Sequence, residues 1–417
     1  MSAEPDFSDA IGPVENHSSP GAIGSAGPPA DSFHVELVVP EPLPAELVFF
    51  SDDPPSPASS SSAGPVSTTW GEARPIGPGF SESIVWMIGG HIIQAVVAVG
   101  GAVALAILYF INHGLPDLNG SSPTTLMHDL VQVLEPNIAA ILGLAGFATV
   151  LYGAAVVSLR FRRQGGLRGL GWRLPSAGHL ALILMAALPL SLLCTELMKS
   201  MVTIAPGAGS ELDEVLKHLA DAPLWLALLS IAVAPALGEE LIFRGLIGRG
   251  LISRMGVVRG LLLTSILFGV MHINPAQAVA VIPLGLAMHF VYLTTRSFWA
   301  PILVHFVNNA LAVFMLKYEA QIPLARLLDG EGALPLHLLT VSAAMVTAIG
   351  LLFWQTRVQY VSADGTPLDT LWPVSDTMPA HGAAIEIRAT PQPLLLACGA
   401  FNSLGFIAVL WRQALVF

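Results

Sequence analysis

From residue 84 onward, the sequence is a succession of apolar stretches separated by short polar segments. The first stretch, Ile84–Ile111, contains no Asp, Glu, Lys or Arg. A helix that crosses a bilayer needs about 20 mostly apolar residues and satisfies its backbone hydrogen bonds internally. We therefore expect eight spans: Ile84–Ile111, Asn137–Leu159, His179–Thr195, Ala222–Leu241, Gly260–Asn274, Ala276–Thr295, Phe298–Leu316 and Ala333–Gln355. A ninth stretch, Pro393–Trp411, is a weaker candidate because it contains Asn402, Ser403 and two glycines.

The composition of the chain favours the same class of protein. Hydrophobic residues make up 53% of the 417 residues and charged residues only 11%, whereas soluble domains carry about 25% charged residues. An ordinary soluble enzyme is excluded. The sequence predicts an all-α, polytopic membrane bundle of about eight transmembrane helices.

The acidity of the chain is concentrated in its N-terminal part. Residues 1–83 hold 12 of the 29 acidic residues and one of the 18 basic residues, and they are rich in proline and serine. This composition predicts a disordered tail. We expect three parts: the tail at 1–83, the bundle at 84–357 and a C-terminal segment at 358–417. The chain has no basic face, so nucleic acid is not an expected partner.

Positive charge follows the even-numbered spans. The loop after the second span carries Arg160, Arg162, Arg163, Arg168 and Arg173, and the loop after the fourth carries Arg249, Arg254 and Arg259. Short loops rich in Lys and Arg stay in the cytoplasm, so we expect a multi-pass protein of the cell membrane with a cytoplasmic N-terminus. The chain has three lysines and fifteen arginines, a bias that indicates a GC-rich bacterial genome and hence a bacterial inner membrane.

Charged residues occur at one place where an apolar span should hold none. Glu239 and Glu240 end the fourth span, and such groups face a protein interior or a water-filled cavity at membrane depth. Arg244 follows Glu240 by four positions, which places both on one helical face and predicts an ion pair. Glu239 points about 100° away and is left free. Pro235 and Gly238 should loosen the helix just before the pair.

Polar residues on two further spans favour a functional site over the alternative that these charges mark the membrane edge. His272 follows Phe268 by one turn on the fifth span, and His305 and Asn309 are spaced i, i+4 on the seventh. Two His, two Glu and one Asn on three apolar spans form a catalytic constellation. Intramembrane Glu and His also relay protons, so a proton-coupled transporter is the alternative function. That alternative predicts repeated or broken helices in matched halves of the chain.

Three motifs resemble those of a known family. EELIFR (Glu239–Arg244), FGVMH (Phe268–His272) and HFVNN (His305–Asn309) are similar to the EExxxR, FxxxH and HxxxN motifs of the CAAX-protease and bacteriocin-processing (Abi) intramembrane proteases. Type II CAAX prenyl endopeptidases belong to this family. The resemblance covers residues 180–316. It implies a helical bundle open toward the cytoplasmic leaflet, and an endopeptidase that cuts protein or peptide substrates, including lipidated ones, near their C-terminus among membrane lipids.

The resemblance also implies roles for individual residues. Glu239 and His272 would activate the attacking water, and His305 and Asn309 would line the oxyanion site. Glu240 and Arg244 would hold the local structure, with Phe268 as packing. A non-catalytic immunity or scaffold member of the family is a further alternative, which the intact motif set disfavours.

The chemistry of hydrolysis suits these residues without the family name. Peptide cleavage needs a base for water, an acid for the leaving amine and donors for the oxyanion, and one carboxylate in an apolar pocket can make both proton transfers. Glu239, His272 and His305 would also suit a zinc site of the His2Glu type. Because the chain has no HExxH motif and no other tight ligand spacing, we favour a metal-free mechanism.

Overall fold

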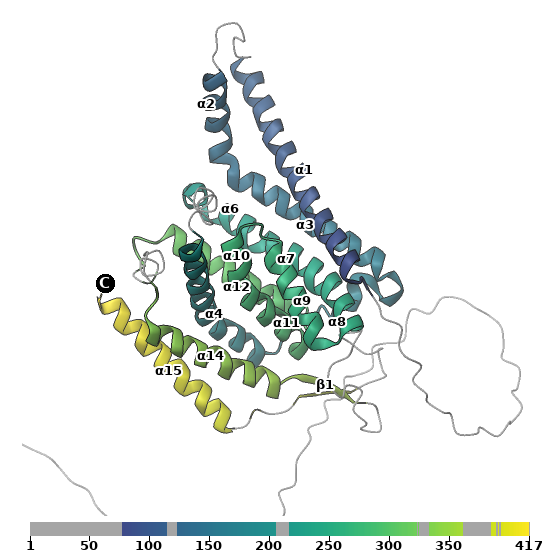
Figure 1. The fold of residues 1–417 in the computed structure, drawn as a ribbon, viewed down its shortest axis with the longest axis vertical. Coiled ribbons are helices and arrows are strands. Elements are labelled where there is room, and N and C mark those ends of the chain that lie inside the picture. The colour runs from purple at the N-terminus through teal and green to yellow at the C-terminus, as the bar shows by residue number, and fades with distance from the viewer. Residues whose placement is uncertain are drawn as a thin grey trace, which may run out of the picture. The chain divides into compact units, whose positions relative to one another are not determined.

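The computed structural model describes residues 77–114, 123–205, 217–322, 324, 333–361, 385–388, 391 and 393–416. All of them belong to the compact unit Trp70–Phe417. Helices dominate these residues, as the sequence predicts, and one two-stranded antiparallel sheet accompanies them (Figure 1). The predicted disordered tail lies outside the described residues up to residue 76. Its last positions belong to the first helix, which begins at Phe80.

The helices that build the bundle follow one another closely along the chain. The first half contains α1 (Phe80–His113), α2 (Pro123–Leu134), η1 (Glu135–Asn137), α3 (Ile138–Arg160), η2 (Arg162–Gln164), η3 (Gly166–Leu170), α4 (Ala177–Ile204), α6 (Leu224–Leu228), η4 (Leu229–Val233) and α7 (Ala234–Glu240). The second half contains η5 (Leu241–Gly248), α8 (Arg249–Met255), α9 (Val257–Val270), α10 (Pro275–Ala280), α11 (Ile282–Thr295), α12 (Trp299–Lys317), α14 (Leu336–Gln355), β1 (Val358–Val361), β2 (Ile385–Arg388) and α15 (Pro393–Val416).

Seven helices among the described residues are long and apolar enough to cross a membrane. They are Phe80–His113, Met127–Arg160, Ala177–Ile204, Leu224–Met255, Pro275–Thr295, Trp299–Lys317 and Leu336–Gln355. They correspond to seven of the eight expected spans, so the chain is a multi-pass membrane protein. The candidate ninth stretch is helical in α15, of which the apolar portion Gly399–Leu410 is shorter.

The expected fifth span, Gly260–Asn274, is the exception. Its helix α9 has 14 residues, which extend about 21 Å against a hydrocarbon core of about 30 Å. The chain reverses directly after it, because Ile273 adopts a left-handed φ of 60° and the Asn274 side chain accepts a hydrogen bond from Gln277 N to start α10. At Gly269 a Cβ would lie 2.2 Å from the Ala278 carbonyl oxygen, so only glycine permits this tight hairpin.

A second boundary also differs from expectation. The third span was predicted to stop at Glu196, but α4 continues past it to Ile204. Glu196 Oε2 accepts a hydrogen bond of 2.8 Å from the backbone N–H of Leu334. This contact with a segment far along the chain satisfies the carboxylate and allows the helix to continue.

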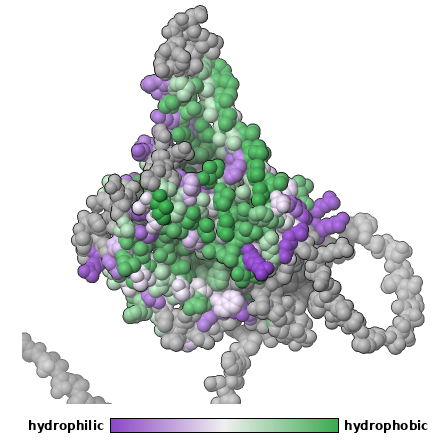
Figure 2. Space-filling model, in the orientation of Figure 1, coloured by the Kyte–Doolittle hydropathy of each residue, from purple (hydrophilic) through white to green (hydrophobic). Residues whose placement is uncertain are grey.

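The spans divide into lipid-facing and central helices. In α1 none of the residues of the most apolar window is buried inside the protein, whereas 56% are buried in both Leu224–Met255 and Pro275–Thr295. Hydrophobic residues cover much of the face shown in Figure 2. Exposed apolar side chains include Val96 and Val99 of α1 and Leu144 and Phe147 of α3. Such exposed apolar surface suits contact with lipid chains. The first of these two central spans, Leu224–Met255, holds Glu239, Glu240 and Arg244.

Hydrogen bonds place the start of α1 and three arginine-bearing loops on one side of the bundle. Arg160 and Arg254 both donate to the Gly77 carbonyl, at 2.8 and 3.1 Å. Arg173 donates to the carbonyls of Thr295 and Arg296, at 2.7 and 2.9 Å. The start of α1 and the loops after the second, fourth and sixth expected spans therefore share one side, as the arginine pattern predicts.

Candidate active site

The helix that carries the two glutamates is not a regular α-helix. Between Leu224 and Met255 it contains two π-helical segments, η4 and η5, on either side of α7. Such segments shift the direction of side chains and occur often at functional sites. Pro235 lies in the first turn of α7 and has no N–H to donate. The predicted loosening near Pro235 therefore takes the form of these π-helical segments.

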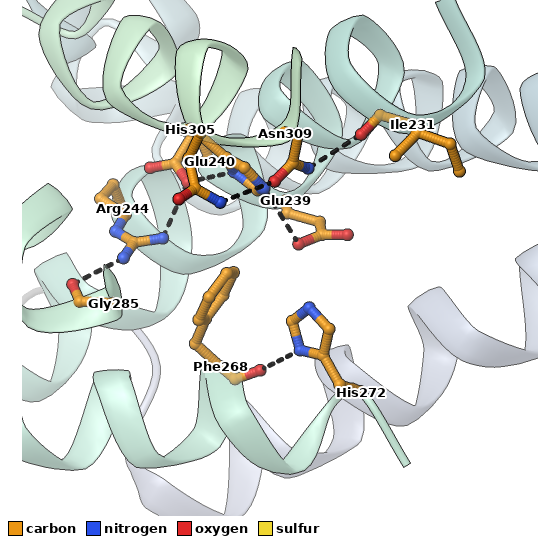
Figure 3. Close-up of polar contacts among 10 residues, drawn as sticks. Ile231, Glu239, Glu240, Arg244, Phe268, His272, Gly285, His305 and Asn309 are labelled. Carbon is orange, nitrogen blue, oxygen red and sulfur yellow. Dashed lines mark hydrogen bonds and ion pairs between the residues drawn. The ribbon is translucent and has the colours of Figure 1, made fainter. Parts of the chain in front are cut away.

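Glu240 and Arg244 form the ion pair that their spacing predicts. Arg244 Nη1 lies 2.8 Å from Glu240 Oε1, and both side chains are fully buried. Arg244 Nη2 also donates to the Gly285 carbonyl at 2.7 Å, and its guanidinium lies 4.9 Å from the ring centroid of Phe268. The arginine thus joins α7, α9 and α11 (Figure 3). This arrangement holds the glutamate helix against two neighbours.

Glu239 has a different environment from its neighbour. Its side chain is 13% exposed, whereas that of Glu240 is fully buried. The Oε2 atoms of both residues are buried and have no hydrogen-bond partner among the described residues. In Figure 3 its carboxylate points away from the Arg244 ion pair and toward the side on which His272 lies. Glu239 is therefore the more exposed carboxylate of the pair.

His305 lies between the two carboxylates. Its Nδ1 is 3.1 Å from Glu240 Oε1, and its Nε2 is 4.0 Å from Glu239 Oε2. A carboxylate oxygen accepts, so Nδ1–H donates to Glu240 and fixes the ring. Nε2 then has a lone pair in the neutral ring and donates only when the ring carries both protons.

His272 is placed by the hairpin turn rather than by a helix interior. It follows the end of α9, and its Nδ1 lies 2.9 Å from the Phe268 carbonyl oxygen. A carbonyl oxygen can only accept, so Nδ1 carries the hydrogen and Nε2 of the neutral ring is an acceptor. The Phe268 ring packs edge-on against both imidazoles, with centroid distances of 5.1 Å to His272 and 5.8 Å to His305. Phe268 is thus a shared packing surface for both histidines.

Asn309 reaches back to the irregular helix. Its Nδ2 donates to the Ile231 carbonyl at 2.8 Å. Pro235, four residues after Ile231, cannot make the α-helical hydrogen bond to this carbonyl. The side chain of Asn309 therefore supplies a donor where proline removes one, and its second N–H is left for another acceptor.

The comparisons with known proteins concern the same part of the chain. Residues 221–311 match the model of a family described as type II CAAX prenyl endopeptidase Rce1-like. The chain carries an Rce1-like region. The resemblance inferred from the three motifs is therefore confirmed, and the match contains all six candidate residues, Glu239, Glu240, Arg244, His272, His305 and Asn309.

A relative of the chain supports the same assignment. YdiL of Bacillus subtilis (strain 168), named "Putative membrane peptidase YdiL", is 28% identical over 109 residues. The alignment covers 26% of this chain and 44% of YdiL, so the chain spans less than half the length of this curated relative. No solved structure matches the chain.

The Rce1-like region does not bring its candidate metal ligands together as a ligand set. Among the described residues, no three His, Cys, Asp or Glu side chains are grouped so that they could hold one metal ion. The preference for a metal-free mechanism stays a prediction, and no step of the mechanism below is routed through a metal.

Several groups of the site were not predicted from the motifs. The Gly285 carbonyl binds Arg244, and the Ile231 carbonyl binds Asn309. Ser191 and Asn308 continue the hydrogen bonding of Asn309 toward α4. Of these groups, only the Ile231 carbonyl could have been suspected from the sequence, because Pro235 has no N–H to donate to it.

Proposed function

We propose that the chain is a CAAX-type intramembrane endopeptidase in which Glu239 activates the attacking water. The observation that carries this proposal is the unequal pair of adjacent glutamates. Glu240 is fully buried and bonded to Arg244 and His305, whereas the Glu239 side chain is 13% exposed and lies 4.0 Å from His305 Nε2. One carboxylate thus has a structural environment and the other suits a general base.

The proposed reaction needs only groups of this site. A water molecule beside Glu239 loses a proton to the carboxylate as its oxygen attacks the scissile carbonyl carbon. Nε2 of His272, an acceptor in the neutral ring, orients the same water. The carbonyl oxygen becomes an oxyanion, which the second N–H of Asn309 and a protonated His305 Nε2 stabilise. Collapse breaks the C–N bond, and Glu239 returns its proton to the leaving amine.

The substrate that we propose is a peptide segment cut near its C-terminus. The family description names prenyl endopeptidases, and α3, which packs against the glutamate-bearing α7, exposes apolar side chains such as Leu144 and Phe147. A peptide carrying a lipidated cysteine would reach such a site from the bilayer. We further propose that the arginine-rich side faces the cytoplasm of a bacterium, so that the substrate enters from the cytoplasmic leaflet.

Purified protein and two related peptides test this proposal. The first peptide ends in a prenylated CAAX sequence, and the second has the same sequence with an unmodified cysteine. We expect the wild type to cleave the prenylated peptide, Glu239→Gln to leave both intact, and Glu319→Gln to match the wild type, since Glu319 is exposed beyond the end of α12. Cleavage by Glu239→Gln at the wild-type rate would refute the proposed base.

A further inference from the structure

Asn309 belongs to a line of three hydrogen bonds that starts at Ser191 in α4 and ends at the Ile231 carbonyl. Ser191 of α4 donates from Oγ to Asn308 Oδ1 at 2.7 Å. Asn308 Nδ2 donates to Asn309 Oδ1 at 3.2 Å, and Asn309 Nδ2 donates to the Ile231 carbonyl at 2.8 Å. The line joins α4, α12 and η4. Ser191 lies outside the three motifs, and Asn308 occupies an unspecified position of the HxxxN motif.

The Ile231 carbonyl determines the donor-to-acceptor direction of all three hydrogen bonds. The Ile231 carbonyl can only accept, so the Asn309 amide must turn its nitrogen toward Ile231 and its oxygen toward Asn308. Asn308 must then present its nitrogen to Asn309 and its oxygen to Ser191. A hydroxyl can donate or accept, and here it must donate. Each side chain therefore has one favourable orientation.

Because each side chain donates to the next in the same direction, the line affects the Asn309 amide in two ways. It prevents the Asn309 amide from turning over, and each bond polarises the next. In the proposed reaction, the second N–H of Asn309 binds the oxyanion. A reversed amide would present an oxygen there instead, which would repel the negative charge.

We propose that Ser191 and Asn308 are positioning residues that hold the Asn309 amide with its second N–H available to the reacting carbonyl oxygen. This inference rests on the proposed function. Neither residue touches the substrate, so their effect must pass entirely through Asn309. That requirement separates the proposal from a general packing role.

Single substitutions give the first test, with the prenylated peptide as substrate. We expect Ser191→Ala to lower kcat roughly three- to tenfold, the scale of one neutral hydrogen bond, with KM unchanged, and Ser191→Thr to restore the rate. Asn308→Asp keeps the size but removes the donor to Asn309, so it should lower kcat about as much as Asn309→Ala, roughly 10²–10³-fold. The matched control is Ser342→Ala in α14, a buried serine that bonds Leu338 O in its own helix, and its kcat should equal that of the wild type.

A double-mutant cycle gives the decisive test. If Ser191 acts only through Asn309, Ser191→Ala adds no further loss of kcat in the Asn309→Ala background. The same fold loss in both backgrounds, or wild-type kcat in Ser191→Ala and Asn308→Asp, would overturn the proposal. Thermal unfolding of each variant identifies one that has failed to fold, and the isosteric Asn308→Asp then replaces Ser191→Ala in the cycle.

Failure of the proposed function can be distinguished from failure of the positioning role of Ser191 and Asn308. If the wild type cleaves no more than Glu239→Gln, the enzyme assignment fails, and the cycle is read from unfolding midpoints instead. Midpoint shifts of Ser191→Ala and Asn309→Ala that are less than additive support the line of hydrogen bonds. Additive shifts contradict it.

Discussion

A single carboxylate oxygen of Glu240 binds both His305 and Arg244, at 3.1 and 2.8 Å. His305 is thereby tied to a buried ion pair rather than to the adjacent Glu239. The two glutamates are adjacent in the sequence but have distinct environments. Glu240 is buried and bonded to Arg244 and His305, whereas Glu239 is partly exposed.

This division predicts opposite outcomes for two matched substitutions. Glu240→Gln leaves the Arg244 charge buried without its partner, which should destabilise the protein by about 3–5 kcal/mol. Glu239→Gln should unfold like the wild type yet lack activity. Thermal unfolding in detergent measures both. Adding Arg244→Met to Glu240→Gln removes the unpaired charge and should recover part of the lost stability, and equal melting of Glu240→Gln and wild type would contradict the assignment.

Loss of an oxyanion donor should appear in turnover. Asn309→Ala removes the second N–H, and His305→Ala removes Nε2, so each should lower kcat by about 10²–10³-fold. Steady-state kinetics at saturating peptide gives the comparison. Asn309→Ala also leaves the Ile231 carbonyl without this donor, so its unfolding midpoint should fall as well. An Asn309→Ala variant with wild-type kcat would remove Asn309 from the mechanism.

The metal question has a direct test. In the metal-free mechanism that we favour, purified active protein contains far less than one zinc per chain, and a chelator leaves turnover unchanged. His272→Ala then lowers the rate without changing the metal content. Near-stoichiometric zinc that is lost together with activity on chelation, and lost in either histidine variant, would instead assign Glu239, His272 and His305 as ligands.

Orientation can be measured by cysteine labelling of intact cells, in a background without Cys194 and Cys398. The arginine pattern predicts that Ser18→Cys and Gln164→Cys are protected from an impermeant reagent added outside. Glu319→Cys, exposed beyond the end of α12, should be labelled and serves as the positive control. The reverse pattern would invert the proposed topology.

Local patterns in the sequence were sufficient to predict most spans and the central ion pair. Long stretches without charge define helices in lipid, and the four-residue spacing of Glu240 and Arg244 places them on one helical face. The end of the fifth span was predicted at Asn274 instead of Val270, because this end depends on the close approach of Gly269 to Ala278 of the following helix. That contact has no periodic signature in the chain.

Hydrogen bonds between distant segments could not be predicted either, because they also have no periodic signature in the sequence. Ser191 and Asn308 are 117 positions apart, and a serine next to apolar residues resembles any serine in a membrane helix. Pro235 gave a partial signal, because it implies a free carbonyl at Ile231. It could not indicate that Asn309 of another helix would bind there.

The most direct test of the central claim is a single-turnover reaction in H₂¹⁸O, read by mass spectrometry of the product and of the protein. Attack by water on the scissile carbonyl predicts one ¹⁸O in the new C-terminal carboxylate and none in Glu239, with no product from Glu239→Gln. An ¹⁸O atom in the Glu239 side chain would indicate direct nucleophilic attack by the carboxylate, and labelled product from Glu239→Gln at the wild-type rate would contradict any role of Glu239 as the base.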